Sequence, residues 1–206
     1  MADLPADRAE NTPPFTNVGM DVFGPWSVVN RRTRGGSSEA KRWAMIFVCL
    51  YTIAIHIEII NSMDTSAFIN ALRRFIAIRG PVKKLRCDQG TNFIGAKNEL
   101  KAALEELDQH QVQRFLTERQ CEWVFNPPHA SHFGGIWERQ IGIVRQVLNS
   151  MYVQLGKPQF THDLLSTLMA EVCAIINARP ITTISSDAND PLALSPSMLL
   201  TMKTQQ

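Results

Sequence analysis

Three acidic residues stand at points of the sequence where carboxylates can do chemistry. Asp21 lies between Met20 and Val22 in a strand-like apolar run, Asp88 ends the run KKLRCD before a glycine turn, and Glu138 opens an amphipathic helix. A buried aspartate costs several kcal/mol unless its charge is neutralised, and a divalent cation does this directly. If the strands of Asp21 and Asp88 are neighbours, both carboxylates reach the end of the sheet where open α/β sheets bind ligands.

Each acid also has a simpler interpretation. Asp21 could belong to a strand edge or a turn, and Asp88 before Gln89-Gly90 could form an Asx turn. Glu138 could offset the macrodipole of its helix by a few tenths of a kcal/mol. The three acids taken together favour a shared site instead, and ligands that are all oxygen favour Mg²⁺ or Mn²⁺ over zinc.

His129 and His132 form an HxxH pair, which also suggests a metal site. Neither a cysteine pair nor a third histidine stands nearby, so structural zinc is disfavoured. The sequence contains no convincing Ser/His/Asp or Cys/His set, which is consistent with chemistry that needs no nucleophilic side chain.

Hydrophobic periodicity and turn residues predict the elements that must position the acids. Strands are expected over residues 15–25, 43–50, 53–60, 82–88 and 121–126, the first ending at Gly24-Pro25. Helices are expected over residues 64–80, 97–107, 111–119, 136–151 and 162–180, and a basic loop over residues 30–42. Short early connections and later helical ones imply a mixed sheet whose first three strands are antiparallel. The last two strands would join it by right-handed crossovers.

Composition limits the class of protein. The 206 residues suffice for one domain, and 45% hydrophobic against 19% charged residues is globular composition. A net charge of +2 neither requires nor excludes a nucleic-acid partner. No signal peptide or membrane span is predicted, so we expect a soluble intracellular protein. The cysteines are widely spaced and expected to be free thiols in a reducing compartment: Cys49, Cys87, Cys121 and Cys173.

Longer blocks around the three acids carry a family resemblance. NVGMDVFGP, LRCDQGTNF and WVFNPPHASHFGGIWERQIGIVRQVL resemble the three catalytic blocks of retroviral and retrotransposon integrase cores, above all those of BEL/Pao-type retrotransposons. The resemblance spans about residues 15–180, preceded by an extended leader (1–14) and followed by a proline-punctuated tail (181–206). It implies an α/β, RNase H-like fold with a five-stranded mixed sheet flanked by helices.

The resemblance also implies an activity. Asp21, Asp88 and Glu138 map onto the D,D,E triad of these enzymes, which process DNA 3′ ends and transfer them to a target strand with two Mg²⁺ (or Mn²⁺) ions per site. It implies element-end and target DNA as partners, a homo-oligomer, no membrane, and a nuclear location. The 49 residues between Asp88 and Glu138 exceed the spacing of the best-known retroviral members, which we attribute to an inserted surface helix within 97–119.

Other residues are expected to contact DNA or to move. By the resemblance, His129 and His132 are loop residues near the substrate, and Gly134-Gly135 lets that loop bend and close so that Glu138 completes the site. The best phosphate-binding candidates share a polar or basic side chain near the acids: Asn92, Arg139 and Arg145. The basic loop could follow a DNA backbone or be a solvated hairpin loop; it carries Arg31, Arg32 and Arg34.

Two alternatives remain open. A catalytically silent, integrase-derived module could keep the fold to bind nucleic acid or protein, although three mutually repelling acids favour an enzyme. The zinc-binding module and most of the C-terminal DNA-binding region of full integrases are not recognised here, so an isolated core is expected to bind DNA ends weakly. An RNase H would share the fold but usually carries a fourth acid, and the block PPHASHFGGIWER argues against it.

Overall fold

The computed structural model describes residues 10–33, 36–88, 107–126, 131–184 and 192–203. Within these ranges the side chains of residues 30–33, 36–37, 88, 126 and 131–134 are not described. The elements in chain order are β1 (Asn17–Thr33), β2 (Gly36–Cys49), β3 (Ile55–Ile60), α2 (Thr65–Arg79), β4 (Lys84–Asp88), α4 (Gln109–Thr117), β5 (Glu122–Asn126), α5 (Ser131–Gln154), α6 (His162–Asn177) and α7 (Pro196–Thr201).

The strands form one mixed sheet in the order β3-β2-β1-β4-β5. β1, β2 and β3 are successively antiparallel, whereas β4 pairs parallel to β1 and β5 pairs parallel to β4. The predicted mixed sheet, with an antiparallel first half and two later strands reached through helices, is therefore confirmed.

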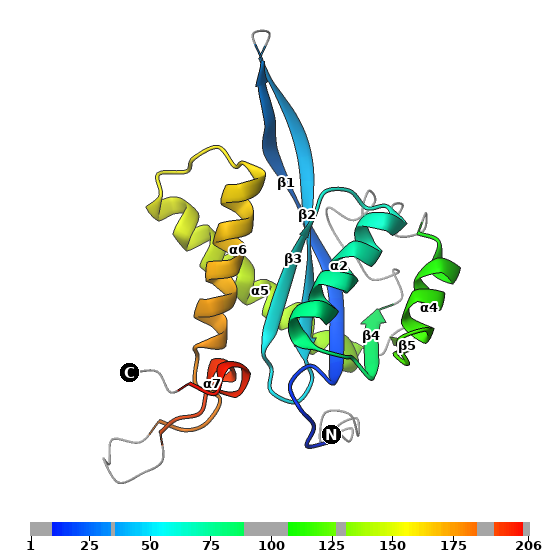
Figure 1. Cartoon of the computed structure of the whole chain (residues 1–206). Helices are drawn as coiled ribbons and strands as arrows, with labels where there is room; N and C mark the ends of the chain where they lie inside the picture. The colour runs from blue at the N-terminus through cyan, green and yellow to red at the C-terminus, as the bar shows by residue number, and fades with distance from the viewer. Residues whose placement is uncertain (1–9, 34–35, 89–106, 127–130, 185–191, 204–206) are drawn as a thin grey trace.

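Strands β1 and β2 continue well past the point at which the sequence predicted a turn. Beyond a register shift between Phe23 and Trp26 the two strands remain paired as far as Thr33 and Gly36. They extend above the rest of the sheet as a two-stranded ribbon (Figure 1). We call residues 26–33 and 36–42 the arm. The prediction of a strand that stops at Gly24-Pro25 was wrong, because the proline falls in the irregularity, where it need not donate a ladder hydrogen bond.

The predicted basic loop over residues 30–42 is likewise corrected. In the described part of that range the backbone is paired as strand, up to Thr33 opposite Gly36. Hairpin pairing satisfies backbone groups that a loop would leave to water, so the pairing extends through polar sequence. The expected helix over residues 97–107 lies outside the described residues.

Helices cover both faces of the sheet (Figure 1). One apolar cluster packs α2 and α4 against Val18, Met20 and Val22 of β1. A second cluster packs α5 and α6 against the opposite face, with Phe23 of β1 and Ile46 of β2 among its members. This alternation along β1 is the period of two expected of a strand that is buried on both sides.

The described residues include no helix that is both long and apolar enough to cross a membrane. All four cysteines are free, as the sequence predicted. Burial raises the pKa of Cys121 to about 11 and that of Cys173 to about 12. Both thiols are therefore protonated near neutral pH and poor nucleophiles.

A buried amide binds the backbone of the edge strand β3 at its first residue. Asn177, buried at the end of α6, accepts a hydrogen bond from the Ile55 amide nitrogen (2.8 Å) and donates one to the Ile55 carbonyl (2.9 Å). The side chain thus satisfies both backbone groups of Ile55, and it ties α6 to the sheet edge.

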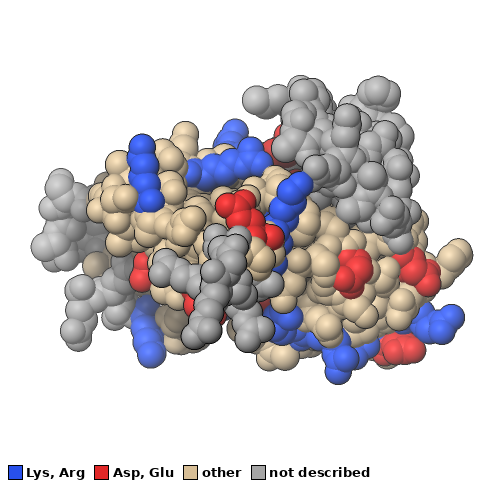
Figure 2. Space-filling model, turned by 90° about the horizontal axis from the view of Figure 1, so that it is seen from above, with Lys and Arg blue, Asp and Glu red and all other residues tan. Residues whose placement is uncertain are grey.

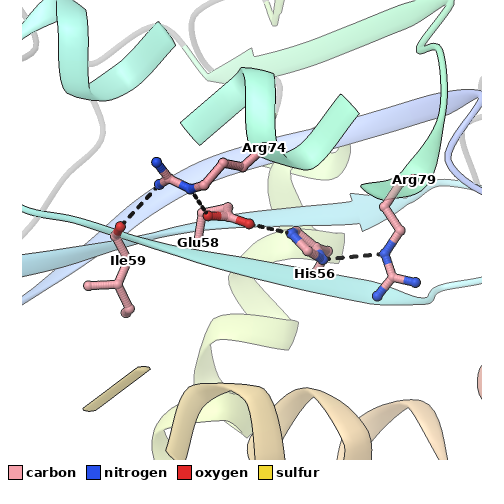
Figure 3. Close-up of polar contacts among 5 residues, drawn as sticks. All are labelled: His56, Glu58, Ile59, Arg74 and Arg79. Atoms are coloured by element: carbon pink, nitrogen blue, oxygen red, sulfur yellow. Dashed lines mark hydrogen bonds and ion pairs between the residues drawn. The ribbon is translucent and has the colours of Figure 1, made fainter. Parts of the chain in front are cut away.

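On the α2 side of β3, four side chains form a polar network (Figure 3). His56 Nε2 lies 2.8 Å from Glu58 Oε1, Arg74 Nε donates to Glu58 Oε2 at 2.5 Å, and Arg79 Nε lies 3.3 Å from His56 Nδ1. Because Nδ1 faces a donor, the contacts place the imidazole proton on Nε2. Burial raises the pKa of Glu58, but hydrogen bonds from His56 and Arg74 and the charge of Arg74 outweigh it and hold that pKa below its ordinary 4.5.

Replacing Glu58 should make the free energy of unfolding less dependent on pH in the acidic range. A carboxyl whose pKa is lowered by folding stabilises the protein above its unfolded pKa, and this contribution is lost as pH falls through the folded value. We expect Glu58→Gln to lower the free energy of unfolding by about 2 kcal/mol at pH 7, with the deficit shrinking below about pH 4.5. Urea unfolding followed by circular dichroism at pH 7 and pH 4 measures it.

Glu118 provides the matched control, since it pairs with Arg119 at 3.8 Å on the surface. Glu118→Gln should change the unfolding free energy by no more than about 0.5 kcal/mol. A Glu58→Gln deficit that is the same at both pH values would contradict the assigned role of the network.

Candidate active site

The two aspartates stand at the same level on neighbouring parallel strands. The parallel pairing of β1 with β4 includes Met20 opposite Cys87, and each aspartate is the residue that follows this pair. Their backbones therefore lie side by side, at about the 4.8 Å spacing of adjacent strands. Asp88 is the last residue of β4, as predicted, so both acids are near the carboxyl end of that strand.

Asp21 faces the α5 side of the sheet. Its neighbours Met20 and Val22 point into the cluster with α2 and α4, while Phe23 belongs to the cluster with α5 and α6. Asp21 lies two residues before Phe23 and therefore on the same face of the strand. Its side chain is half-buried. Its Oδ1 accepts a hydrogen bond of 2.7 Å from the Val22 amide nitrogen, which orients the carboxylate.

Helix α5 reaches this face through one close contact. The Trp137 ring is fully buried, and a Cβ placed on Gly19 would lie 2.2 Å from its Cε3 atom. Only a glycine at position 19 leaves room for the ring. Since Gly19 precedes Asp21 by two residues and Glu138 follows Trp137, the contact brings the two acidic positions onto the same part of the sheet. The sequence analysis did not identify Gly19, although a glycine in a buried strand is a signal of close approach.

Helix α5 is amphipathic, as its sequence predicted. Its apolar stripe comprises residues that are buried, or in the last case partly buried, against the sheet: Trp137, Ile141, Val144, Leu148 and Met151. A second face of α5 is exposed along its length, from Glu138 through Gly142 and Arg145 to Asn149. A carboxylate on this face is open to solvent and to a substrate.

Two predictions about the start of α5 were wrong. The helix begins at Ser131, so His132, Gly134 and Gly135 are helical and not part of a closing loop, while His129 lies outside the described residues. Glycine disfavours a helix by only about 1 kcal/mol relative to alanine, and the anchoring of Trp137 offsets this. Because Glu138 now lies beyond the first turn, where the macrodipole effect fades, that simpler interpretation of Glu138 fails.

The predicted DNA-contacting residues fall into three groups. Arg139 and Arg145 are exposed on α5, whereas Arg31 and Arg32 belong to the arm with side chains that are not described; Asn92 and Arg34 lie outside the described residues. Seen along the arm, the lysine and arginine side chains of the described residues form separate groups with acidic side chains between them (Figure 2).

The candidate metal ligands are carboxylates. Among the side chains that the structure describes, no three His, Cys, Asp or Glu groups converge on one point. The side chain of Asp88 is not among those described. Side-by-side aspartate backbones with a glutamate on the covering helix supply carboxylate oxygens only, which suits Mg²⁺ or Mn²⁺.

No known family model matches the sequence, and neither does any curated protein. Solved structures do match. A chain of the simian T-cell lymphotropic virus intasome, in complex with the PP2A regulatory subunit B56 gamma, superposes with a TM-score of 0.59 at 13% identity over 92% of this chain and 55% of that one. This chain thus spans about half the length of the intasome chain.

The catalytic core domain of HTLV-2 integrase, in complex with magnesium, matches in two forms. The dimeric form has a TM-score of 0.58 at 14% identity and covers 93% of this chain and 99% of that one. The trimeric form has a TM-score of 0.53 at 15% identity and covers 86% and 93%. The fold is RNase H-like. It resembles that of a retroviral integrase core in its five-stranded mixed sheet with helices, and the predicted fold class is confirmed.

The Gly19–Trp137 contact predicts opposite effects of alanine at two glycines. Gly19→Ala forces a methyl group into the buried ring and should lower the free energy of unfolding by about 1–3 kcal/mol. Gly142→Ala is the control, because a Cβ there meets nothing within 4 Å, and it should raise that free energy by up to about 1 kcal/mol. Urea unfolding of both variants tests this. Equal stability of Gly19→Ala and wild type would show that the ring is not held against β1.

Proposed function

We propose that this chain is the catalytic core of an integrase of BEL/Pao-type retrotransposons. It would process DNA 3′ ends and join them to a target strand with Asp21, Asp88 and Glu138. The observation that carries the proposal is the parallel register that sets Asp21 beside Asp88, under the helix that bears Glu138. A fold resembling the HTLV-2 integrase core, described in complex with magnesium, supports it.

The three carboxylates would hold two divalent cations, Mg²⁺ or Mn²⁺, which supply Lewis acidity for in-line phosphoryl transfer. The residues themselves position the reaction. Asp21 and Asp88 hold one end of the site from the rigid sheet, and Glu138 closes it from α5. In strand transfer a DNA 3′-OH attacks a target phosphodiester, so one P–O bond forms, one breaks, and the departing oxygen leaves as a new 3′-OH.

The proposal includes the partners. Element ends and target DNA are the substrates, and Arg139 and Arg145, exposed on α5, contact phosphates beside the acids. Asn92 and the arm residues Arg31, Arg32 and Arg34 extend this contact. The protein acts as a homo-oligomer in the nucleus, where chromosomal target DNA is found. The dimeric and trimeric forms of the HTLV-2 core support the oligomer.

The proposed phosphoryl transfer can be tested by the resealing of a branched DNA that mimics the strand-transfer product. This substrate depends least on DNA contacts made by domains outside the core. With Mn²⁺ or Mg²⁺, wild-type protein should reseal the branch. Glu138→Gln should lower the rate at least about 100-fold, because it removes a carboxylate ligand and not merely a supporting residue. Gel separation of labelled products measures the rate.

Glu171 is the matched control, since it is an exposed glutamate on α6. Glu171→Gln should reseal as fast as wild type. Equal activity of Glu138→Gln and wild type would remove Glu138 from the site. A folded wild-type protein that neither reseals the branch nor binds Mn²⁺ would overturn the catalytic proposal in favour of a silent, integrase-derived binding module.

A further inference from the structure

An open pocket of about 360 Å³ lies where the base of the arm meets α5. Its lining comes from three segments and includes Pro25 and Trp26 of β1, Arg145, Asn149 and Tyr152 of α5, and Phe160 before α6. The volume is near the lower end of small-ligand pockets, about 300–1,000 Å³, and suits one planar ring system better than a duplex.

The aromatic walls of the pocket are held in place by their neighbours. The Tyr152 and Phe160 rings stack at 4.7 Å, and Trp26 packs edge-on against the buried Phe23 ring at 5.4 Å. The Val29 amide nitrogen donates to the Phe160 carbonyl at 2.8 Å, which ties the connector before α6 to the arm. Rings that are already positioned lose little entropy when a ligand stacks on them.

The polar groups of the pocket select the charge of its ligand. Its lining includes one cation, Arg145, and one amide, Asn149, but no acidic side chain. Arg145 and Asn149 are exposed and make no side-chain hydrogen bond or ion pair with any residue that the structure describes. Aromatic faces with a guanidinium and an amide at the rim suit a nucleobase with its phosphate, since bases stack on such rings and their edges bond to amides.

The position of the pocket relative to the acids sets which nucleotide it can reach. Along β1, Gly24 at the pocket is three residues beyond Asp21, about 10 Å at roughly 3.3 Å per residue. Along α5, Arg145 is seven residues beyond Glu138 on the same exposed face, about 10.5 Å at 1.5 Å per residue. Phosphates of one DNA strand are spaced by about 3.4 Å along the axis, so the pocket lies about three nucleotides from the reacting phosphate.

We propose that the pocket between the arm base and α5 binds an unpaired base of the DNA substrate, about three nucleotides from the phosphate that reacts. Trp26 and Tyr152 stack on the base, Asn149 bonds to its edge, and Arg145 pairs with the adjoining phosphate. The base must be unpaired because its faces are covered inside a duplex. This inference rests on the proposed function, since it takes DNA as the substrate of the carboxylate site.

The test uses the branched DNA with 2-aminopurine placed three nucleotides from the branch phosphate. In one probe the 2-aminopurine faces an abasic site and is unpaired; in a second it is paired with thymine; in a third it is unpaired but ten nucleotides away. Wild-type protein should quench the first probe alone and bind it most tightly. Fluorescence titration gives both the quenching and the dissociation constant.

Variants of the pocket should separate stacking from phosphate contact. Trp26→Ala should weaken binding of the first probe by roughly 5- to 150-fold, the range for losing one stacked base, and Trp26→Phe should restore most of it. Arg145→Gln should weaken the binding of the first and second probes by similar factors, because a contact with a phosphate does not depend on whether the base is paired. Tyr51→Ala is the control: this exposed aromatic lies at the β2–β3 turn and should leave binding unchanged.

Resealing activity measured on the same wild-type preparation distinguishes the two proposals. Active protein that quenches all three probes alike, or none of them, overturns the pocket and leaves the proposed function standing. Protein that quenches the first probe selectively, but neither reseals the branch nor binds Mn²⁺, supports the pocket as a DNA site and overturns the catalytic function. Equal binding of the first probe by folded Trp26→Ala and wild type overturns the pocket.

Discussion

The closeness of helix α5 to strand β1 sets the geometry of the whole candidate site. A tryptophan ring fills the space that a side chain at Gly19 would occupy, so the helix rests against bare backbone. Every residue on the exposed face of α5 takes its position from this contact, because a helix is rigid over such lengths. The sheet supplies two aspartates at one level, and the ring determines where the glutamate stands above them.

The acidic side chains of this fold lie in different surroundings. Glu138 is exposed on α5, and Asp21 is half-buried on β1. Glu58 differs from both, because its half-buried carboxylate on β3 is compensated by Arg74 and His56. The same fold thus pairs one carboxylate with cationic and polar partners and leaves another open to solvent.

Much of the fold was predictable because its signals are local. The end of β4 at Asp88 and the apolar stripe of α5 that begins at Trp137 follow from turn chemistry and helical period. Non-local pairing explains what was missed. Pro25 indicates the end of a strand, but β1 continues beyond it because it pairs with β2. Gly134-Gly135 indicates a hinge, but the packing of α5 against the sheet keeps this segment helical. The pocket depends on α5 meeting the arm, which no local pattern of Trp26 or Tyr152 reveals.

The amide of Asn177 has a consequence for how copies of this chain can meet. An edge strand with unpaired backbone groups is a template onto which another chain can add, and this is a route to aggregation. At β3 the Asn177 side chain already occupies the outward donor and acceptor of Ile55. A foreign strand would have to displace a buried amide to extend the sheet there. The Asn177 amide therefore protects the start of β3 from pairing with a strand of another molecule.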